Sequence, residues 1–196
     1  MKIYTFEQGT PEWFAVRLGK LTASKAQAIG NAGKGLETLC WEKAAEILTG
    51  EFAEQIENDD IKRGVELEDE ARNAYSLETG KEVKQVGFIE YSDYAGASPD
   101  GLVDDDGLTE YKCKNDVNHL KLITSRVVDS KYIWQMQMQM LVAERDWCDF
   151  VSYNPRFTNH PLVIMRFHKD PAYQRKLIEG IKIGTDKILE ILKTVQ

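Results

Sequence analysis

The chain has 196 residues, a hydrophobic content of 42% and a formal net charge of −7. This length and apolar content suffice for one sizeable core and leave little room for a second, so we expect a single domain over residues 1–196. The negative charge taken alone argues against a nucleic-acid partner, because affinity for a polyanion comes from lysine and arginine side chains that neutralise phosphates.

Two further absences define the expected location. No apolar run approaches the roughly 20 residues of a membrane helix, and the first residues lack the apolar stretch of a signal peptide. Three cysteines without regular metal-site spacing fit reduced thiols better than a disulfide framework or a zinc site. We therefore expect a cytoplasmic protein with no membrane partner.

The charge is unevenly distributed. Residues 1–111 carry 11 Lys+Arg against 23 Asp+Glu, a net −12, whereas residues 112–196 carry 14 against 9, a net +5. Residues 14–35 hold four cations and no acidic residue: Arg17, Lys20, Lys25 and Lys34. One part of an acidic chain can therefore face DNA.

The front of the chain is predicted to be helical. Thr10-Pro11-Glu12 places a capping residue before a proline, which is a helix-start signal. A second short helix begins at residues 22–25, a flexible loop occupies 31–35, and glycines end the next two helices. The first of these two helices is expected at about 36–48 and ends at Gly50. The second is expected to begin at Asp59 and Asp60, to run to about Thr79 and to end at Gly80.

Strand patterns begin after Lys81 and alternate with helices, which indicates an α/β fold. One strand is expected between Val83 and Tyr91, and an acidic turn at 104–107 joins two more as a hairpin. The alternating residues 135–140 also fit a strand, but their flanks favour a helix, which we predict. The expected order is strands 101–103 and 109–114, helices 117–125 and 130–144, strands 148–153 and 162–167, and a terminal helix.

The hairpin carries the candidate chemistry. In a strand over 109–114, alternation puts Glu110 and Lys112 on one face, about 6–7 Å apart, and the hairpin brings Asp100 beside Glu110. Two carboxylates and a lysine suit phosphodiester hydrolysis with Mg²⁺, which binds through one or two carboxylates plus phosphate oxygens. Lys112 would activate the attacking water or stabilise developing negative charge, and the sequence leaves both roles open.

Plainer interpretations exist for these acidic residues. A Glu-x-Lys pattern usually marks a solvated strand face, and three aspartates in a turn are ordinary turn chemistry. Glu68 lies beside the apolar stripe of the long helix, where a carboxylate needs a partner. That partner is a metal or Arg72 at i+4, and helix geometry alone favours the ion pair.

The ordered motifs resemble the lambda-exonuclease (YqaJ-like) branch of the PD-(D/E)XK nucleases, which includes phage-type alkaline exonucleases. The resemblance implies a restriction-endonuclease-like core, with a central mixed β-sheet flanked by helices and a helical N-terminal portion. It rests on Arg17-Leu18-Gly19, Thr22-Ala23-Ser24, Gly64 to Glu68, Ala97 to Leu102, Glu110-Tyr111-Lys112-Cys113 and Gln135-Met136-Gln137.

The resemblance also implies roles for single residues. Asp100 and Glu110 would be metal ligands and Lys112 the catalytic lysine, with Mg²⁺ as cofactor and Mn²⁺ as a substitute. Glu68 would be a third metal ligand, which reverses the ion-pair preference. Gln135 would lie close to the catalytic centre, although a glutamine on a helix is ordinarily a solvated side chain.

Three further residues match positions that engage the 5′-phosphate in this family: Arg17, Ser24 and Lys34. Ser24 lies at a predicted helix start, where free N–H groups favour anions, and glycines flank Lys34. Lysine lacks the planar fork of arginine, so its contact would be less directional. The ordinary alternative for Arg17 and Lys20 is solvated helix charge.

The implied function is a processive 5′-to-3′ exonuclease. It would digest one strand of linear double-stranded DNA to mononucleotides and leave a 3′ overhang for phage-type recombination with a single-strand annealing protein, in a bacterial or phage-infected cell. The family also implies a ring-shaped homotrimer with a basic channel. The rival interpretations are an endonuclease of restriction or repair type and a non-catalytic DNA-end-binding module.

Overall fold

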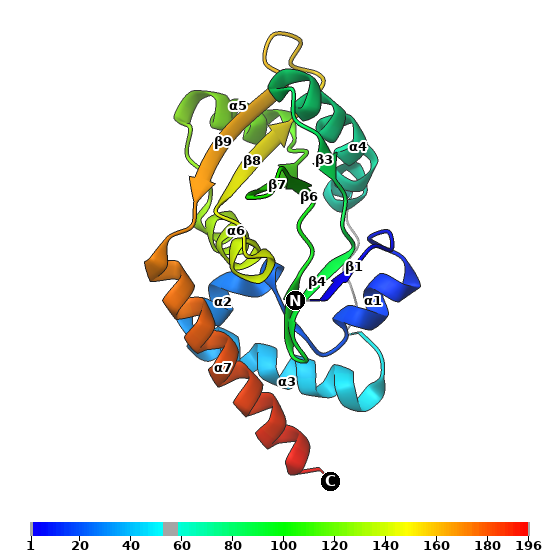
Figure 1. The fold of residues 1–196 in the computed structure, drawn as a ribbon, viewed down its shortest axis with the longest axis vertical. Coiled ribbons are helices and arrows are strands. Elements are labelled where there is room, and N and C mark those ends of the chain that lie inside the picture. The colour runs from blue at the N-terminus through cyan, green and yellow to red at the C-terminus, as the bar shows by residue number, and fades with distance from the viewer. Residues whose placement is uncertain (1, 53–58, 196) are drawn as a thin grey trace.

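The structure is a computed structural model that describes residues 2–52 and 59–195, and the side chains of all of these except 59–66. Most of the Gly64 to Glu68 motif therefore lies outside the described side chains. Two mixed sheets form the framework (Figure 1). The five-stranded sheet has the order β3 (Val83–Lys84), β6 (Gly101–Val103), β7 (Gly107–Lys112), β8 (Trp147–Tyr153) and β9 (Leu162–His168).

The second sheet has four short strands in the order β1 (Lys2–Tyr4), β4 (Phe88–Ser92), β5 (Ala95–Ala97) and β2 (Leu21–Thr22). Parallel pairing joins β7 to β8 and β2 to β5, and the other pairs are antiparallel. The helices are α1 (Pro11–Arg17), the 3₁₀ turn η1 (Ala23–Lys25), α2 (Ala26–Asn31), α3 (Lys34–Thr49), α4 (Asp59–Thr79), α5 (Asp116–Ser125), α6 (Ser130–Ala143) and α7 (Pro171–Lys193). Over the described ranges, none of them is long and apolar enough to cross a bilayer.

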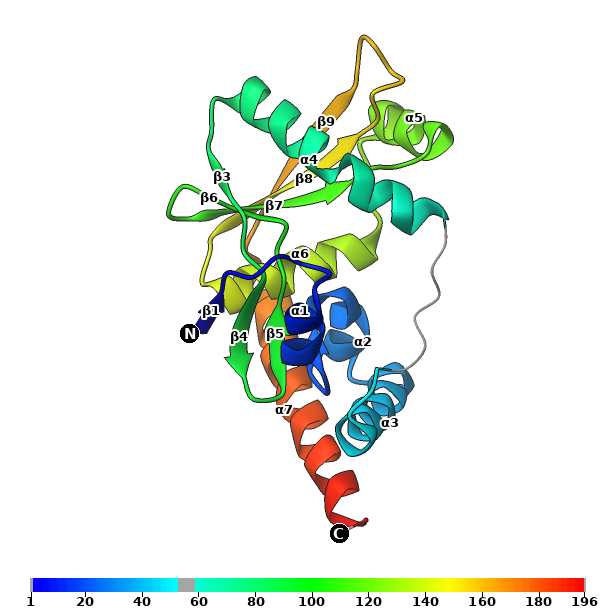
Figure 2. The same ribbon diagram turned by 90° about the vertical axis from the view of Figure 1, so that its right-hand side faces the viewer.

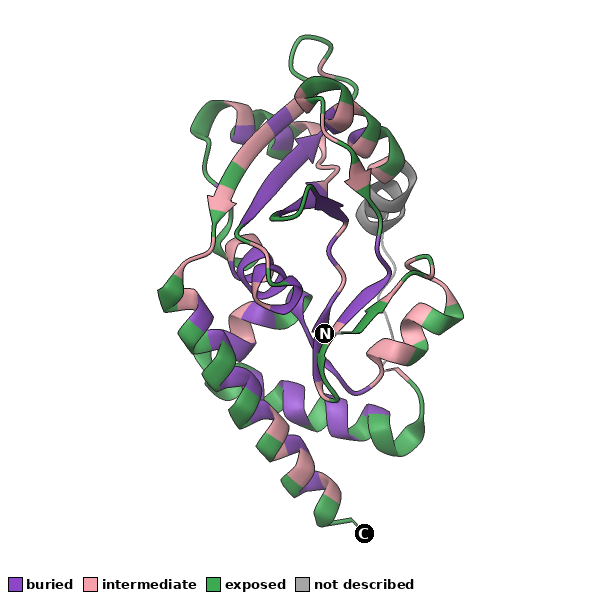
Figure 3. Cartoon of the chain, viewed as in Figure 1, coloured by how far each residue is buried: buried purple, intermediate pink, exposed green. Residues whose placement is uncertain are grey.

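Strand alternation divides the five-stranded sheet into two packed faces. One face of β7 and β8 packs on α4 through Tyr111, Val151 and Trp147, and the other packs on α6 through Leu108 and Phe150. Helices α2, α3 and α7 lie beyond α6 (Figures 1 and 2). The inner helix α6 is therefore mostly buried after its first turn, whereas α7 has an exposed stripe along its length (Figure 3).

A hydrogen bond from Tyr75 to the buried Asp149 fastens α4 to its face of the sheet. Asp149 on β8 accepts two hydrogen bonds from the Arg166 guanidinium, both 2.8 Å, and a third from the Tyr75 hydroxyl at 2.8 Å. Arg166 also stacks on Trp147, with the guanidinium carbon 3.6 Å from the ring centroid. Because Tyr75 is two helical turns after Glu68, this anchor also fixes the height of Glu68 along the sheet.

The helix and hairpin predictions are confirmed with small shifts at the ends, and two predictions are wrong. The strand expected from Val83 to Tyr91 is two strands in different sheets, because the chain leaves β3 before it enters β4. The loop expected at 31–35 is shorter, since α2 continues to Asn31 and α3 begins at Lys34. Ala32, in the left-handed region at φ 48°, makes the turn between them.

The helices behind α6 approach one another closely at glycines. A Cβ on Gly180 of α7 would lie 2.0 Å from the Ile29 carbonyl oxygen of α2. A Cβ on Gly30 would lie 2.1 Å from the Trp134 ring of α6. Helix α2 therefore touches both neighbours at positions where only glycine fits.

Gly180→Ala is expected to lower the free energy of unfolding by about 1–3 kcal/mol, because the added methyl meets rigid backbone and forces α7 away from α2. Gly35→Ala is the matched control. Its Cβ would meet only ordinary contacts, the nearest at 3.4 Å, and alanine favours the helix. Urea unfolding of both variants measures the difference, and equal stability of the two would contradict the close packing of α7.

Candidate active site

The β6–β7 hairpin brings the predicted carboxylates and lysine together. Gly101 pairs with Thr109, so Asp100 precedes the paired residues at the level of Glu110. The Asp100 Oδ2 atom accepts the Tyr111 N–H at 2.7 Å, and the Lys112 ammonium contacts the Glu110 Oε1 atom. We call Asp100, Glu110 and Lys112 the hairpin site.

Glu110 is wholly buried, and helix α6 supplies two of its hydrogen-bond donors. The Gln135 amide donates to Glu110 Oε1 at 2.7 Å, so the structure places this predicted residue beside the hairpin site. The Gln139 amide donates to Glu110 Oε2 at 2.6 Å. Sequence reasoning missed Gln139, although its i+4 spacing from Gln135 puts both on one helix face.

Charges within the hairpin site perturb one another. Burial raises the pKa of Asp100 well above its ordinary value, and the Glu110 carboxylate raises it further, while Lys112 opposes both. Burial alone would lower the pKa of Lys112, but the Glu110 and Asp100 carboxylates hold it above the ordinary lysine value. Lys112 is therefore a protonated cation at neutral pH in this structure.

Glu68 makes the ion pair that helix geometry favours. Its Oε1 atom lies 2.9 Å from the Arg72 guanidinium, which also contacts Asp69. Burial raises the pKa of Glu68, Arg72 lowers it, and Glu110 raises it. The interaction with Glu110 shows that Glu68 lies within electrostatic reach of the hairpin site, so its carboxylate faces both a cation and other carboxylates.

The donor set suits a hard divalent cation. Among the described side chains, those of residues 2–52 and 67–195, no group of three or more His, Cys, Asp or Glu is placed closely enough to enclose an ion. Mg²⁺ does not need such a cage, since it keeps several waters and takes one or two carboxylates plus substrate phosphate. Asp100 and Glu110 provide two carboxylates whose mutual repulsion a cation would relieve.

Arg17 is linked to the hairpin site through a serine. Its guanidinium donates to the Ser98 hydroxyl at 3.0 Å and stacks on the Trp13 ring, 3.9 Å from the centroid. The Trp13 indole N–H also reaches Ser98, at 2.9 Å. Ser98 is two residues before Asp100, so this Arg17 network adjoins the hairpin site, and Ser98 and Trp13 were not predicted.

Arg17 is a partly buried cation whose hydrogen-bond and stacking partners, Ser98 and Trp13, are neutral. Burial lowers its pKa to about 10, and Glu46 only partly offsets this effect. The guanidinium therefore stays charged at neutral pH, and an anion placed beside it would be stabilised. Lys20, by contrast, is committed to protein contacts, because its ammonium donates to the Asp93 carbonyl at 2.5 Å and lies 3.4 Å from Glu90.

The other two predicted phosphate residues are solvent-exposed. Ser24 lies in η1, and its hydroxyl is 3.3 Å from that of Thr22. Lys34 is the first residue of α3 and not part of a flexible loop, so its position is more rigid than expected. The structure shows no hydrogen bond from either described side chain to Arg17.

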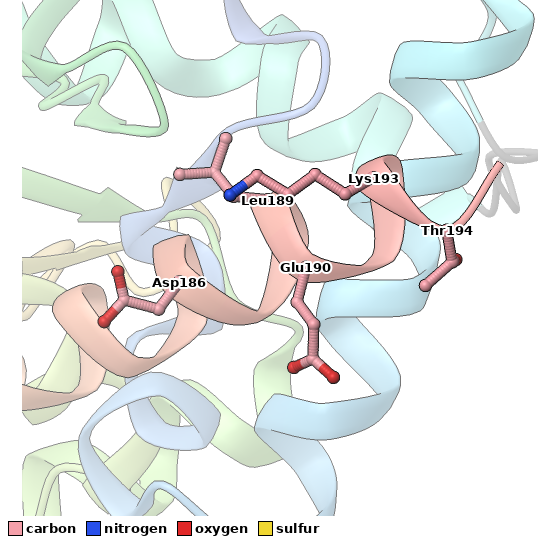
Figure 4. Close-up of a pocket in the computed structure, with 5 residues that line it drawn as sticks. All are labelled: Asp186, Leu189, Glu190, Lys193 and Thr194. Carbon is pink, nitrogen blue, oxygen red and sulfur yellow. The ribbon is translucent and has the colours of Figure 1, made fainter. Parts of the chain in front are cut away.

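A surface pocket of about 470 Å³ lies elsewhere, along the last turns of α7 (Figure 4). Its lining is Asp186, Leu189, Glu190, Lys193 and Thr194. Figure 1 shows that this end of α7 projects away from both sheets. We assign the pocket no part in the chemistry of the hairpin site.

A family model described as the YqaJ-like viral recombinase domain matches residues 12–146. The chain belongs to this family. The match begins before Trp13 and ends after α6, so it contains both the Arg17 network and the hairpin site. The resemblance inferred from the ordered motifs is thereby confirmed.

Solved structures of this type share the fold. The alkaline exonuclease LHK-Exo of Laribacter hongkongensis is 36% identical, with a TM-score of 0.87 over 95% of this chain and 96% of that one. The same enzyme in complex with dAMP gives a TM-score of 0.88 at the same identity and coverage. A phage-related exonuclease of Haemophilus somnus 129PT, 16% identical over 90% of this chain and 96% of that one, gives 0.74 and supports the fold alone.

One curated relative is much longer. The uncharacterized protein R354 of Acanthamoeba polyphaga mimivirus is 25% identical over 168 residues, and the match covers 77% of this chain but only 30% of that protein. The chain thus spans about a third of that relative's length.

The expected α/β fold with helices around a mixed sheet is confirmed, and the structure adds a second, smaller sheet to it.

Asp100→Asn is expected to raise the melting temperature of the metal-free protein at neutral pH. Asparagine keeps an acceptor for the Tyr111 N–H and removes a partly buried negative charge beside Glu110. A carboxyl whose folded pKa is raised costs stability as pH rises above its unfolded pKa. The advantage of the variant should therefore vanish in acid and grow towards neutral pH. Thermal melts in EDTA across this range measure it, and a less stable variant at neutral pH would contradict the charge cluster.

Proposed function

We propose that this chain is a metal-dependent deoxyribonuclease that digests one strand of linear double-stranded DNA from the 5′ end. The observation that carries the proposal is the hairpin site, where two carboxylates and a protonated lysine meet on the central strand β7 and at the start of β6. Family membership and the likeness to LHK-Exo, an alkaline exonuclease, support the same activity.

Each residue of the hairpin site has a role in the proposed hydrolysis. Asp100 and Glu110 would hold the cation, with Glu68 as a further ligand once it leaves Arg72. When bound, Mg²⁺ or Mn²⁺ lowers the pKa of water and offsets charge on the scissile phosphate. Lys112, which contacts Glu110, would stabilise the developing negative charge or activate the attacking water.

The Arg17 network would define the 5′ polarity. A terminal phosphate beside Arg17 and Ser98 would lie one short loop from Asp100, so the end of the strand would be bound next to the hydrolytic residues. Ser24 and Lys34 would add contacts to the same phosphate or to its neighbours. The dAMP bound to LHK-Exo supports a product of mononucleotide size.

The net negative charge of the chain has to be reconciled with binding to DNA. We propose a ring-shaped homotrimer in which the basic surface faces the DNA and the acidic surface faces outward, because a single acidic subunit repels a polyanion. The 3′ overhang would be passed to a single-strand annealing protein for recombination in a bacterial or phage-infected cell. Residues 1–196 would act as one nuclease domain.

Lys112→Ala is expected to slow Mg²⁺-dependent digestion of a linear duplex by at least about 100-fold, because it removes the cation that stabilises developing charge. Release of mononucleotides from a 5′-phosphorylated duplex measures the rate, and circular dichroism checks the fold. Full activity of the variant would refute the site.

The same assay separates the rival functions. Covalently closed circular DNA should stay intact with the wild-type protein, whereas cleavage of the circle would establish an endonuclease. Tight binding to DNA ends without turnover at any Mg²⁺ or Mn²⁺ concentration would establish a binding module.

Arg17→Ala is expected to remove the preference for a 5′-phosphorylated end over a 5′-hydroxyl end, because the partly buried cation of the Arg17 network is lost. Lys193→Ala is the matched control, since it removes the same charge on the last turn of α7. Initial rates on the two duplex ends measure the preference. An unchanged preference in Arg17→Ala would show that the 5′-phosphate binds elsewhere.

A further inference from the structure

Gln139 is a buried polar side chain with one strong partner. Its exposed fraction is 0%, and its amide nitrogen donates to Glu110 Oε2 at 2.6 Å. The same nitrogen lies 3.5 Å from the Ser98 carbonyl oxygen, at the limit of a hydrogen bond. Gln139 therefore lies between the loop that leads to Asp100 and the strand that carries Glu110.

The amide oxygen of Gln139 is buried without a hydrogen-bond partner among the described residues. Such an acceptor is costly, and an apolar side chain would avoid the cost, as Met138 and Met140 do on either side. Turning the amide over would set its oxygen against the Glu110 carboxylate, so the observed orientation is the one that the carboxylate selects. Packing alone does not account for an amide here.

The donors around Glu110 leave little of the carboxylate free. A carboxylate has about four lone-pair positions, two on each oxygen. Lys112 and Gln135 donate to Oε1, and Gln139 donates to Oε2. One acceptor position, on Oε2, is left for another ligand.

Gln139 differs from Lys112 in what it does to the charge of Glu110. A neutral amide can orient a carboxylate without neutralising it, whereas an ammonium group does both. Hydrogen bonds to the remaining lone pairs of a metal-ligating carboxylate commonly set its orientation and its affinity for the ion. The oxygen that Gln139 holds is the one with the open position.

We infer that Gln139 is a positioning residue that fixes the Glu110 carboxylate so that its Oε2 atom presents one lone pair to a divalent cation. The inference rests on the proposed function, since it assumes that Glu110 binds that cation. Helix α6 would then position both oxygens of one carboxylate, because Gln135 donates to Oε1 of Glu110 and Gln139 donates to Oε2.

Gln137 offers a matched control on the same helix. It is as buried as Gln139, with an exposed fraction of 2%, but it points away from the site. Its amide donates to the His168 carbonyl at 2.8 Å, and its oxygen accepts from the Asp170 N–H and the Gln174 amide, both at 3.0 Å. Gln137 therefore ties α6 to the start of α7 and leaves Glu110 untouched.

The test is calorimetric titration of the whole protein with Mn²⁺, without DNA, for the wild type, Gln139→Met and Gln137→Met. We expect Gln139→Met to raise the Kd for Mn²⁺ by about 10- to 100-fold, and the Mg²⁺ concentration for half-maximal digestion to rise in parallel. Gln137→Met should lower the melting temperature but keep the wild-type Kd. Gln139→Leu carries the same expectation if the methionine variant does not fold.

The outcomes separate the two proposals. A wild-type Kd in folded Gln139→Met, with Mn²⁺ bound by the wild type, overturns the positioning role and leaves the metal site standing. Absence of Mn²⁺ binding by the wild type overturns both. An equal loss of affinity in Gln137→Met would show that any buried amide of α6 acts through the fold, which also overturns the inference.

Discussion

The structure depends on one buried charge, the carboxylate of Glu110. A carboxylate with no exposed surface is stable only where hydrogen bonds and positive charge replace water, and three donors do so here. Lys112 comes from the same strand, and both amides come from α6. The requirement to satisfy Glu110 thus fixes the distance and rotation of α6 against the sheet, and with them the position of the helices packed behind it.

The same carboxylate explains why the site is electrostatically strained in this structure. Asp100 approaches Glu110 through the hairpin, and burial together with the Glu110 charge raises the pKa of Asp100. An excess of negative charge of this kind is typical of cation-binding sites, whereas carboxylates in a purely structural cluster are paired with lysine or arginine side chains. The Arg17 network has the opposite imbalance, because a half-buried cation has neutral hydrogen-bond and stacking partners and Glu46 offsets its burial only in part. The excess negative charge of the hairpin site and the positive charge of Arg17 thus lie at opposite ends of the short segment from Ser98 to Asp100.

Much of this arrangement follows from patterns that the sequence carries. Strand alternation was enough to put Glu110 and Lys112 on one face, and the hairpin turn was enough to add Asp100. Three features were beyond such patterns. The two- and three-residue strands of the smaller sheet have too little periodicity to detect, and Ser98 and Trp13 meet Arg17 only through tertiary packing. Gln139 was detectable, because the helical period separates it from Gln137, but the alternating glutamines and methionines obscured the period.

Gly30 shows how far the demands of the site extend. Its missing side chain lets the Trp134 ring settle against α2, and Trp134 is the residue before Gln135. A larger residue at position 30 would displace the ring, and α6 could not move without carrying its amides away from Glu110. The size of the side chain at position 30 is therefore limited by the geometry that α6 must keep around Glu110. Homologues that change Gly30 are expected to carry a smaller aromatic or aliphatic residue at position 134, so that the two positions vary as a pair.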